Sequence, residues 1–162
     1  MTTVTPCLWF DGNAEEAVEF YVSLVPGSKI TAVSRYGPGM PYPEGMVMTI
    51  SFELAGSAYS ALNAGPEFHF TEAISLQLSA ADQEEVDRYW ARLSEGGGEP
   101  GPCGWVKDRY GLSWQVVPDA LPALLSDPDP LRAHAAGQAL MKMSKIDISA
   151  LHEAADAASG AG

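Results

Sequence analysis

The sequence predicts an α+β protein built from two similar modules, each a strand and a helix followed by further strands, with short helices after the second module. Three observations carry this prediction. Strand-like segments alternate with amphipathic helical segments. The same order of elements occurs twice, near residues 5–63 and 73–117, and the chain after Pro118 shows only helical patterns. Such an internal repeat is a strong indication of architecture.

The first module starts with a strand at residues 5–10 and a helix that follows a short turn. Asn13, with Glu16 three residues later, predicts a capping box at the start of this helix. A Pro-Gly pair at residues 26–27 ends it. The apolar side chains follow the spacing of an amphipathic helix, at Ala14, Ala17, Val18, Tyr21 and Val25.

Three further strands complete the first module, at residues 28–36, 46–54 and 58–63. A loop rich in proline and glycine separates the first two of them. In the strand 46–54, apolar and polar side chains alternate, which predicts one face packed and one face polar. The predicted polar face carries Val47, Thr49, Ser51 and Glu53.

The second module repeats this order. A strand at residues 73–79 precedes a helix whose start is marked by Asp82 and Glu85, a second cap pair. A glycine run at residues 96–98 ends the helix, and strands at 105–109 and 112–117 follow.

The segment after residue 118 predicts short helices at residues 119–126, 130–143 and 148–158. We therefore divide the chain into a domain of residues 1–118 and a helical appendage of residues 119–162. The appendage is expected to cover a sheet edge or to build a dimer surface. Its candidate contact residues are Leu140, Met141, Met143 and Leu151.

Composition excludes several classes of partner. The 162 residues carry a formal net charge of −12, which repels phosphate backbones and anionic lipid surfaces, so neither nucleic acid nor membrane is expected. No apolar run reaches the length of a membrane span, and the first residues lack the pattern of a signal peptide. Two cysteines are too few for a disulfide framework. We expect a cytoplasmic protein with reduced thiols.

Three stretches resemble a known family: LWFDGNAEEAVEFY, ALNAGPEFHF and CGWVKDRYGLSWQVVP. They are similar to the PhnB-like group, labelled 3-demethylubiquinone-9 3-methyltransferase, of the glyoxalase/bleomycin resistance/dioxygenase superfamily, whose fold is called vicinal oxygen chelate. The resemblance covers nearly the whole chain. It implies two βαβββ modules that form a curved mixed sheet around a cavity, and a homodimer.

Metal-using members of that superfamily place a histidine on the first strand of each module and a glutamate on the last strand. By spacing from the helix caps, these positions fall on Pro6, Ala73 and Gln115. The first two have no donor, and Gln115 offers only a neutral carbonyl. Glu72 and Cys7 lie one residue away, which turns a side chain to the opposite face. We therefore expect no metal and no cofactor.

Gln115 is a neutral amide between Trp114 and Val116 in a strand that should be half buried. If its two neighbours face the helices, Gln115 faces the cavity that the resemblance implies. The same alternation assigns further neutral polar residues to that side: Ser113, Ser75, Gln77, Thr49 and Ser51. Such a lining suits a small ligand with several polar groups. The alternative is that these residues bond to one another or to buried water.

Five other residues are candidate ligand contacts. Asn63 matches the asparagine of a family motif at the cavity mouth, although asparagine also commonly stabilises turns. Tyr36 and Trp105 could form aromatic walls or belong to the core. His69 is more typical of a surface loop, and Glu72 adjoins a former ligand position. Trp9, Trp90 and Trp114 are assigned to the core. We assign no catalytic residue.

These observations leave three classes of function. The first is a metal-free binding protein for a small polar organic molecule. The second is a metal-dependent enzyme of the glyoxalase or dioxygenase type. The third is the methyltransferase of the family label, which needs a glycine-rich turn after the first strand of a doubly wound sheet. The glycines at residues 96–98 follow a helix instead.

Overall fold

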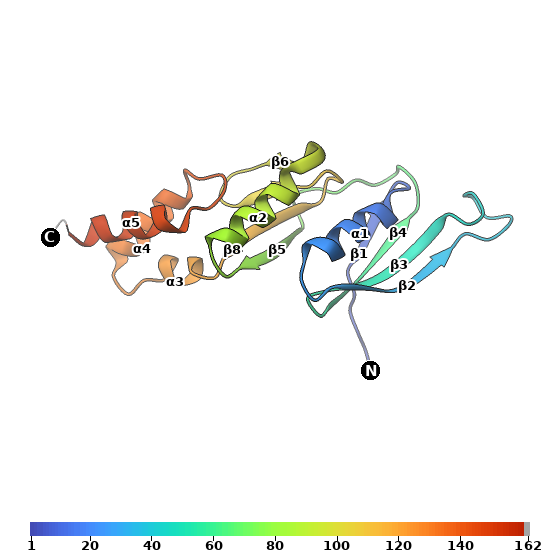
Figure 1. Ribbon diagram of the computed structural model, residues 1–162, viewed down its shortest axis with the longest axis horizontal. Helices are drawn as coiled ribbons and strands as arrows, with labels where there is room; N and C mark the ends of the chain where they lie inside the picture. The colour runs from blue at the N-terminus through green and yellow to red at the C-terminus, as the bar shows by residue number, and fades with distance from the viewer. Residues whose placement is uncertain (161–162) are drawn as a thin grey trace. The chain divides into compact units, whose positions relative to one another are not determined.

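The protein has an α+β fold with two four-stranded sheets, as Figure 1 shows for the computed structural model. The structure describes residues 1–160. The chain divides into two compact units, Met1–Phe70 and the part from Thr71 onward, and each is described by itself. Within the described residues, no helix combines the length and apolar character needed to cross a membrane.

The first unit holds one helix and one mixed sheet. Its elements are β1 (Cys7–Phe10), α1 (Ala14–Leu24), β2 (Lys29–Arg35), β3 (Val47–Leu54) and β4 (Ser57–Asn63). The sheet order is β1-β4-β3-β2, and β1 runs parallel to β4 while the other pairs are antiparallel. Ile50 and Phe52 of β3 are buried, whereas Ser51 between them is exposed. The alternation therefore gives a packed face and an open face. Val47, predicted on the polar face, is buried beside a register shift.

The start of α1 differs from the prediction. Asn13 occupies the N-cap position, but its side chain makes no capping hydrogen bond. Instead the backbone N–H of Ala14 donates to Oδ1 of Asn63 at 2.9 Å. The capping box predicted at Asn13 is therefore wrong, because a residue distant in sequence satisfies this helix end.

The second unit repeats the arrangement, with β5 (Ser75–Ala80), α2 (Gln83–Ser94), the short 3-10 turn η1 (Glu95–Gly97), β6 (Glu99–Pro100), β7 (Trp105–Lys107) and β8 (Ser113–Pro118). The sheet order is β5-β8-β7-β6. The cap pair predicted for α2 is confirmed: Oδ1 of Asp82 accepts from the backbone N–H of Glu85, whose own carboxylate accepts from the N–H of Ala81.

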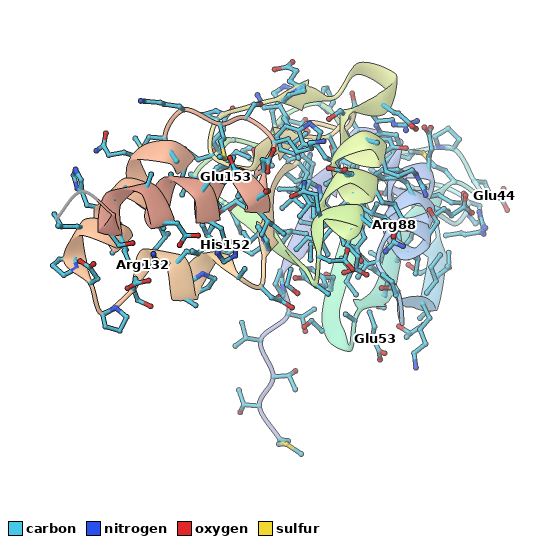
Figure 2. All side chains as sticks on the ribbon, turned by 60° about the vertical axis from the view of Figure 1, so that its left-hand side comes forward. Glu44, Glu53, Arg88, Arg132, His152 and Glu153 are labelled. Atoms are coloured by element: carbon cyan, nitrogen blue, oxygen red, sulfur yellow. The ribbon has the colours of Figure 1, made fainter. Side chains whose placement is uncertain are left out.

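Helices α3 (Leu121–Leu125), α4 (Pro130–Leu140) and α5 (Ile148–Ser159) form the appendage. Arg132 of α4 is labelled in Figure 2. Its guanidinium bonds to Asp127 at 3.0 Å and to Asp156 of α5 at 2.7 Å, and the second contact ties α4 to α5. The appendage belongs to the second unit. The backbone N–H of Gly104, just before β7, donates to Ser144 O at 2.8 Å. This hydrogen bond joins the appendage to the second sheet. A separate domain from residue 119 stays a prediction.

The dimer contact predicted on the appendage needs correction. Leu151 is fully buried in a small apolar cluster of the appendage, and Leu140 and Met143 pack against that cluster. Only Met141 of the four residues is largely exposed. Leu151 therefore stabilises the appendage itself and is not available for a C2 interface, whereas a contact through the exposed Met141 stays a prediction.

Candidate functional site

The open face of the second sheet is the candidate site. Trp114 and Val116 of β8 and Leu78 of β5 are buried, and α2 contacts these strands. Because side chains alternate along a strand, the residues between them point to the face away from α2. This open face carries Ser113 and Gln115 of β8 and Ser75 and Gln77 of β5.

The strand register arranges the open face in two rows. The first row runs across all four strands through Glu99, Lys107, Ser113 and Ser75. The second row holds Trp105, Gln115 and Gln77. Paired residues on neighbouring strands are close enough for their side chains to contact one another. The face thus has a charged end in the first row and an aromatic and amide row beside it.

The amide of Gln115 bonds to its neighbours in both directions. Its Nε2 donates to Ser75 Oγ at 2.8 Å, and Gln77 Nε2 donates to Gln115 Oε1 at 3.4 Å. The second bond is long and therefore weak. Since a carbonyl oxygen has two lone pairs, Oε1 retains capacity for a further donor. The residues satisfy one another, as the alternative interpretation of the sequence held, yet they still present a polar surface.

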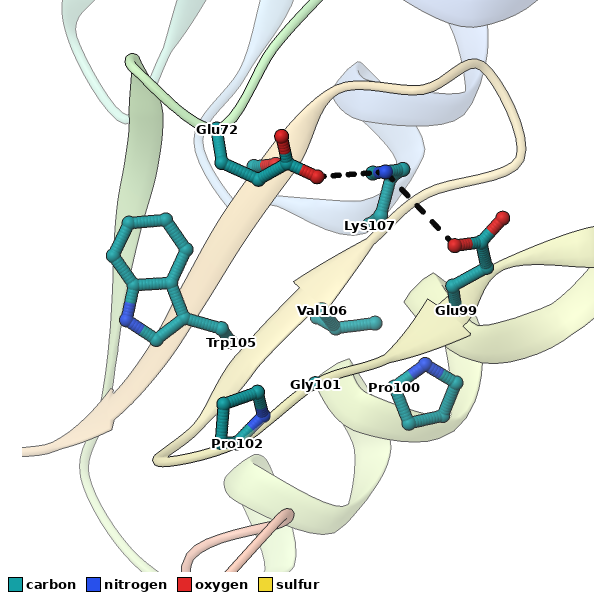
Figure 3. Close-up of a pocket in the computed structure, with 9 residues that line it drawn as sticks. Glu72, Glu99, Pro100, Gly101, Pro102, Trp105, Val106 and Lys107 are labelled. Atoms are coloured by element: carbon teal, nitrogen blue, oxygen red, sulfur yellow. Dashed lines mark ion pairs between the residues drawn. The ribbon is translucent and has the colours of Figure 1, made fainter. Parts of the chain in front are cut away.

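A hollow of about 420 Å³ opens at the charged end of this face (Figure 3). Its volume lies within the range of small-molecule sites, roughly 300–1,000 Å³. The lining comes from β6, the loop after it, β7, the start of β8 and the segment before β5. It consists of Glu72, Glu99, Pro100, Gly101, Pro102, Trp105, Val106, Lys107 and Ser113. We call this feature the hollow.

Lys107 holds two carboxylates at the hollow. Its Nζ lies 2.8 Å from Glu72 Oε1 and 3.9 Å from Glu99 Oε2. The hydrogen bond from Lys107 lowers the pKa of the Glu72 carboxyl, and the same contact raises the pKa of Lys107. Glu72 is therefore ionised near neutral pH, and its lowered pKa makes it a poor general base.

The Glu72–Lys107 pair predicts a pH dependence of stability. Folding lowers the pKa of Glu72. The contribution of Glu72 to the free energy of unfolding is therefore fully present above its ordinary pKa of 4.5, and it is lost as the pH falls through the pKa that Glu72 has in the folded protein. Glu72→Gln should therefore unfold more easily than wild type at about pH 6, and the difference should shrink as the pH falls below 4.5. Urea unfolding over a series of pH values measures this. A similar loss in the exposed variant Glu44→Gln, or a Glu72→Gln deficit that persists in acid, would contradict the assignment.

Asp108 builds the turn that leads into β8, and sequence reasoning missed it. This carboxylate is 3% exposed. Its Oδ1 accepts from the backbone N–H groups of Tyr110 at 2.8 Å and Leu112 at 3.1 Å, and its Oδ2 accepts from the Trp114 indole at 2.9 Å. The signal available in the sequence was an aspartate two residues before Tyr110-Gly111, because aspartate bonds to backbone N–H groups in turns. Asp108 thereby positions Ser113 and Gln115.

The first unit holds the remaining predicted site residues. Asn63 is 1% exposed, and its Nδ2 donates to Val47 O at 2.9 Å while its Oδ1 holds α1. The Tyr36 hydroxyl donates to Asn63 O. These two side chains join α1, β3 and β4, so their geometry supports a structural role. Ligand contact by either stays a prediction.

Other side chains of the first unit lie on its open face or its surface. Thr49 and Ser51 are on the open face of the first sheet, where Thr49 exchanges a hydroxyl hydrogen bond with Ser34. His69 is exposed. Trp9 is half-buried and packs edge-on against Phe68 with ring centres 4.9 Å apart. The core assignment is therefore confirmed for Trp114 and wrong for Trp9 and for Trp90, which is also half-buried.

Comparisons with known proteins agree with this architecture. The family model described as 3-demethylubiquinone-9 3-methyltransferase matches residues 2–117. A PhnB protein from Bacillus cereus is 33% identical, with a TM-score of 0.65, over 72% of this chain and 99% of that chain. Protein PA1353 from Pseudomonas aeruginosa is 23% identical, with a TM-score of 0.60, over 73% and 98%. None of the curated proteins compared matches the chain.

A more distant similarity bears on the fold alone. The fosfomycin resistance protein FosX from Listeria monocytogenes, in complex with Mn(II) and sulfate, is 13% identical. Its TM-score is 0.52, over 76% of this chain and 94% of that chain.

The residues present here do not fit a metal ion at the positions that the superfamily uses. Ala73 and Pro6 offer no donor atom, and the Gln115 carbonyl accepts an amide hydrogen from Gln77. Among residues 1–160, no three histidine, cysteine, aspartate or glutamate side chains gather in a group that could hold a metal. Neutral amide oxygen is also a weak ligand for transition metals.

Proposed function

The chain belongs to the 3-demethylubiquinone-9 3-methyltransferase family, a PhnB-like branch of the vicinal-oxygen-chelate superfamily, and from this premise we propose that it binds a small polar organic molecule without a metal ion. The observation that carries the proposal is the hollow beside the two rows of hydrogen-bonding side chains. A concave surface with a few convergent polar groups is the usual form of a small-molecule site.

The open face of the second sheet supplies complementary hydrogen-bonding groups. Gln77 and Gln115 each carry an amide donor and acceptor, and Ser75 and Ser113 carry hydroxyls that act in either sense. The hydrogen bonds that join Gln77, Gln115 and Ser75 hold these three side chains in place before a ligand arrives. Preorganised polar groups lose less conformational entropy when they bind.

The methyl transfer named in the family's label receives no support from this architecture. Enzymes that hold S-adenosylmethionine on a doubly wound fold use a parallel sheet with a glycine-rich first turn. The described chain has two mixed sheets of four strands instead. We therefore expect no binding of S-adenosylmethionine in titration calorimetry.

Gln115→Leu should abolish most of the binding, because it removes both polar groups at the centre of the second row. A thermal-shift screen of small polar organic compounds, run with EDTA, identifies ligands of the wild-type protein. The variant is expected to bind these ligands about tenfold or more weakly, the loss of one or two hydrogen bonds. Gln138→Leu, on the exposed surface of α4, is the matched control and should leave binding unchanged.

Two outcomes would contradict the proposal. One is a set of ligands whose shifts are identical in wild type and Gln115→Leu. The other is binding that disappears with EDTA and returns with Mn²⁺, Co²⁺, Ni²⁺ or Zn²⁺, which would support the metal-dependent class of enzyme instead.

We also propose a homodimer, supported by family membership alone. Light scattering should give twice the chain mass of 17.2 kDa. A monomeric mass at all concentrations would contradict it. The free thiols of Cys7 and Cys103 are compatible with the reducing cytoplasm that we propose as its location.

A further inference from the structure

We infer that the hollow selects an organic cation, a protonated primary amine carried on a flat apolar body. The inference rests on the proposed function and names the class of ligand for the same site.

The charged side chains of the hollow leave it negative. Glu72 and Glu99 face a single cation, Lys107. Lys107 Nζ contacts Glu72 at 2.8 Å, whereas Glu99 is 3.9 Å away and 74% exposed at its side chain. Glu99 is thus only loosely paired, and the formal charge of −12 on the chain adds a field of the same sign. Such a field attracts cations to a concave site and repels anions.

Trp105 provides a platform beside these charges. It lies two residues before Lys107 on β7 and on the same face, at a spacing of about 7 Å along the strand. Tryptophan binds ammonium groups over its ring face more strongly than other aromatic residues do, within about 6 Å. The rings of Pro100 and Pro102 add apolar surface to the lining. A ligand with a flat apolar body therefore fits this wall.

Ser113 supplies a hydroxyl to the hollow. It is 2% exposed as a residue and lines the hollow beside Lys107. Because a hydroxyl oxygen accepts hydrogen bonds, Ser113 can accept a hydrogen from the ammonium group of a ligand.

Three indole compounds test the charge preference, because they share one ring system and differ in net charge. Tryptamine is a cation, tryptophan a zwitterion and indole-3-propionate an anion. Titration calorimetry of the full chain at low salt should give the tightest binding for tryptamine, by roughly fivefold or more. The advantage should shrink as salt screens the charges.

Glu99→Gln tests the residue that carries the preference. It should weaken tryptamine binding roughly fivefold and leave indole-3-propionate unchanged or tighter. Because the Glu99 side chain is largely exposed, the variant should fold as the wild type does. Glu44→Gln removes a charge from an exposed loop position and should not alter tryptamine binding.

The outcomes separate the inference from the proposed function. Tightest binding of indole-3-propionate would overturn the inference and show that Lys107 dominates, while leaving a metal-free binding site in place. Failure of all three indoles, together with screen ligands that depend on Gln115, would also overturn the inference alone. If no compound of the screen depends on Gln115, both the inference and the proposed function fail.

Discussion

Replacing Asp108 with alanine is expected to lower the free energy of unfolding by about 3–4 kcal/mol. The substitution leaves two backbone N–H groups and the Trp114 indole without their acceptor in a buried turn. Each such orphaned donor costs about 1–3 kcal/mol. The loss also loosens the start of β8, so any ligand that depends on Gln115 should bind more weakly to the variant.

The matched control for this prediction is Asp119→Ala, an exposed aspartate just after β8. It should change stability by less than about 0.5 kcal/mol. Urea unfolding followed by tryptophan fluorescence measures both variants. Equal stability of Asp108→Ala and wild type would refute the role of this carboxylate in the turn.

Asn63→Ala is expected to destabilise the first unit by about 2–4 kcal/mol. The Asn63 amide caps α1 through Ala14 and satisfies the Val47 carbonyl on β3. Loss of a cap costs about 0.5–2 kcal/mol and an unsatisfied buried carbonyl about 1–3 kcal/mol. Asn63→Asp keeps the acceptor for Ala14 and loses the donor to Val47, but it also places a charge in a buried site.

Asn13→Ala is the informative comparison for Asn63→Ala. Asn13 holds the N-cap position without a side-chain bond, so its replacement should cost less than about 0.5 kcal/mol. Thermal and chemical unfolding should therefore rank Asn63→Ala far below Asn13→Ala in stability. The opposite ranking would mean that the local capping box of the sequence prediction is correct after all.

The contrast between the two helix starts shows what a single sequence can predict. Asp82 and Glu85 cap α2 within a few residues, so their spacing alone predicted the geometry. The partner of Ala14 lies 49 residues away along the chain. Such a pairing depends on tertiary packing, and no local pattern carries it.

The candidate site divides in the same way. Side chains alternate strictly along β8, with a period of two residues. This alternation was enough to predict that Gln115 and Ser113 lie on the same face of the strand. Edge strand β6, which brings Glu99 opposite Lys107, is only a Glu-Pro pair and has no recognisable pattern. The sequence therefore did not predict the charged end of the site. Glu72 was a candidate only because it adjoins the position of a metal ligand in other members of the superfamily.

The appendage shows that an apolar pattern in the sequence does not identify the surface that will cover it. Its apolar residues were interpreted as a dimer surface because the segment has no counterpart in the first module. Leu151 instead packs with Leu121, Leu124 and Ile146. A hydrophobic stripe predicts burial, and the stripe alone does not distinguish burial within the chain from burial against a partner.

We propose that a small organic molecule binds to the open face of the second sheet without a metal ion. The most direct test is NMR titration in EDTA with the strongest ligand of the screen. It follows the indole N–H of Trp105 and the side-chain amide of Gln115. We predict saturable shifts of both signals, with few changes in α3, α4 and α5. Shifts confined to residues outside β5, β7 and β8, or shifts that require added metal, would contradict the claim.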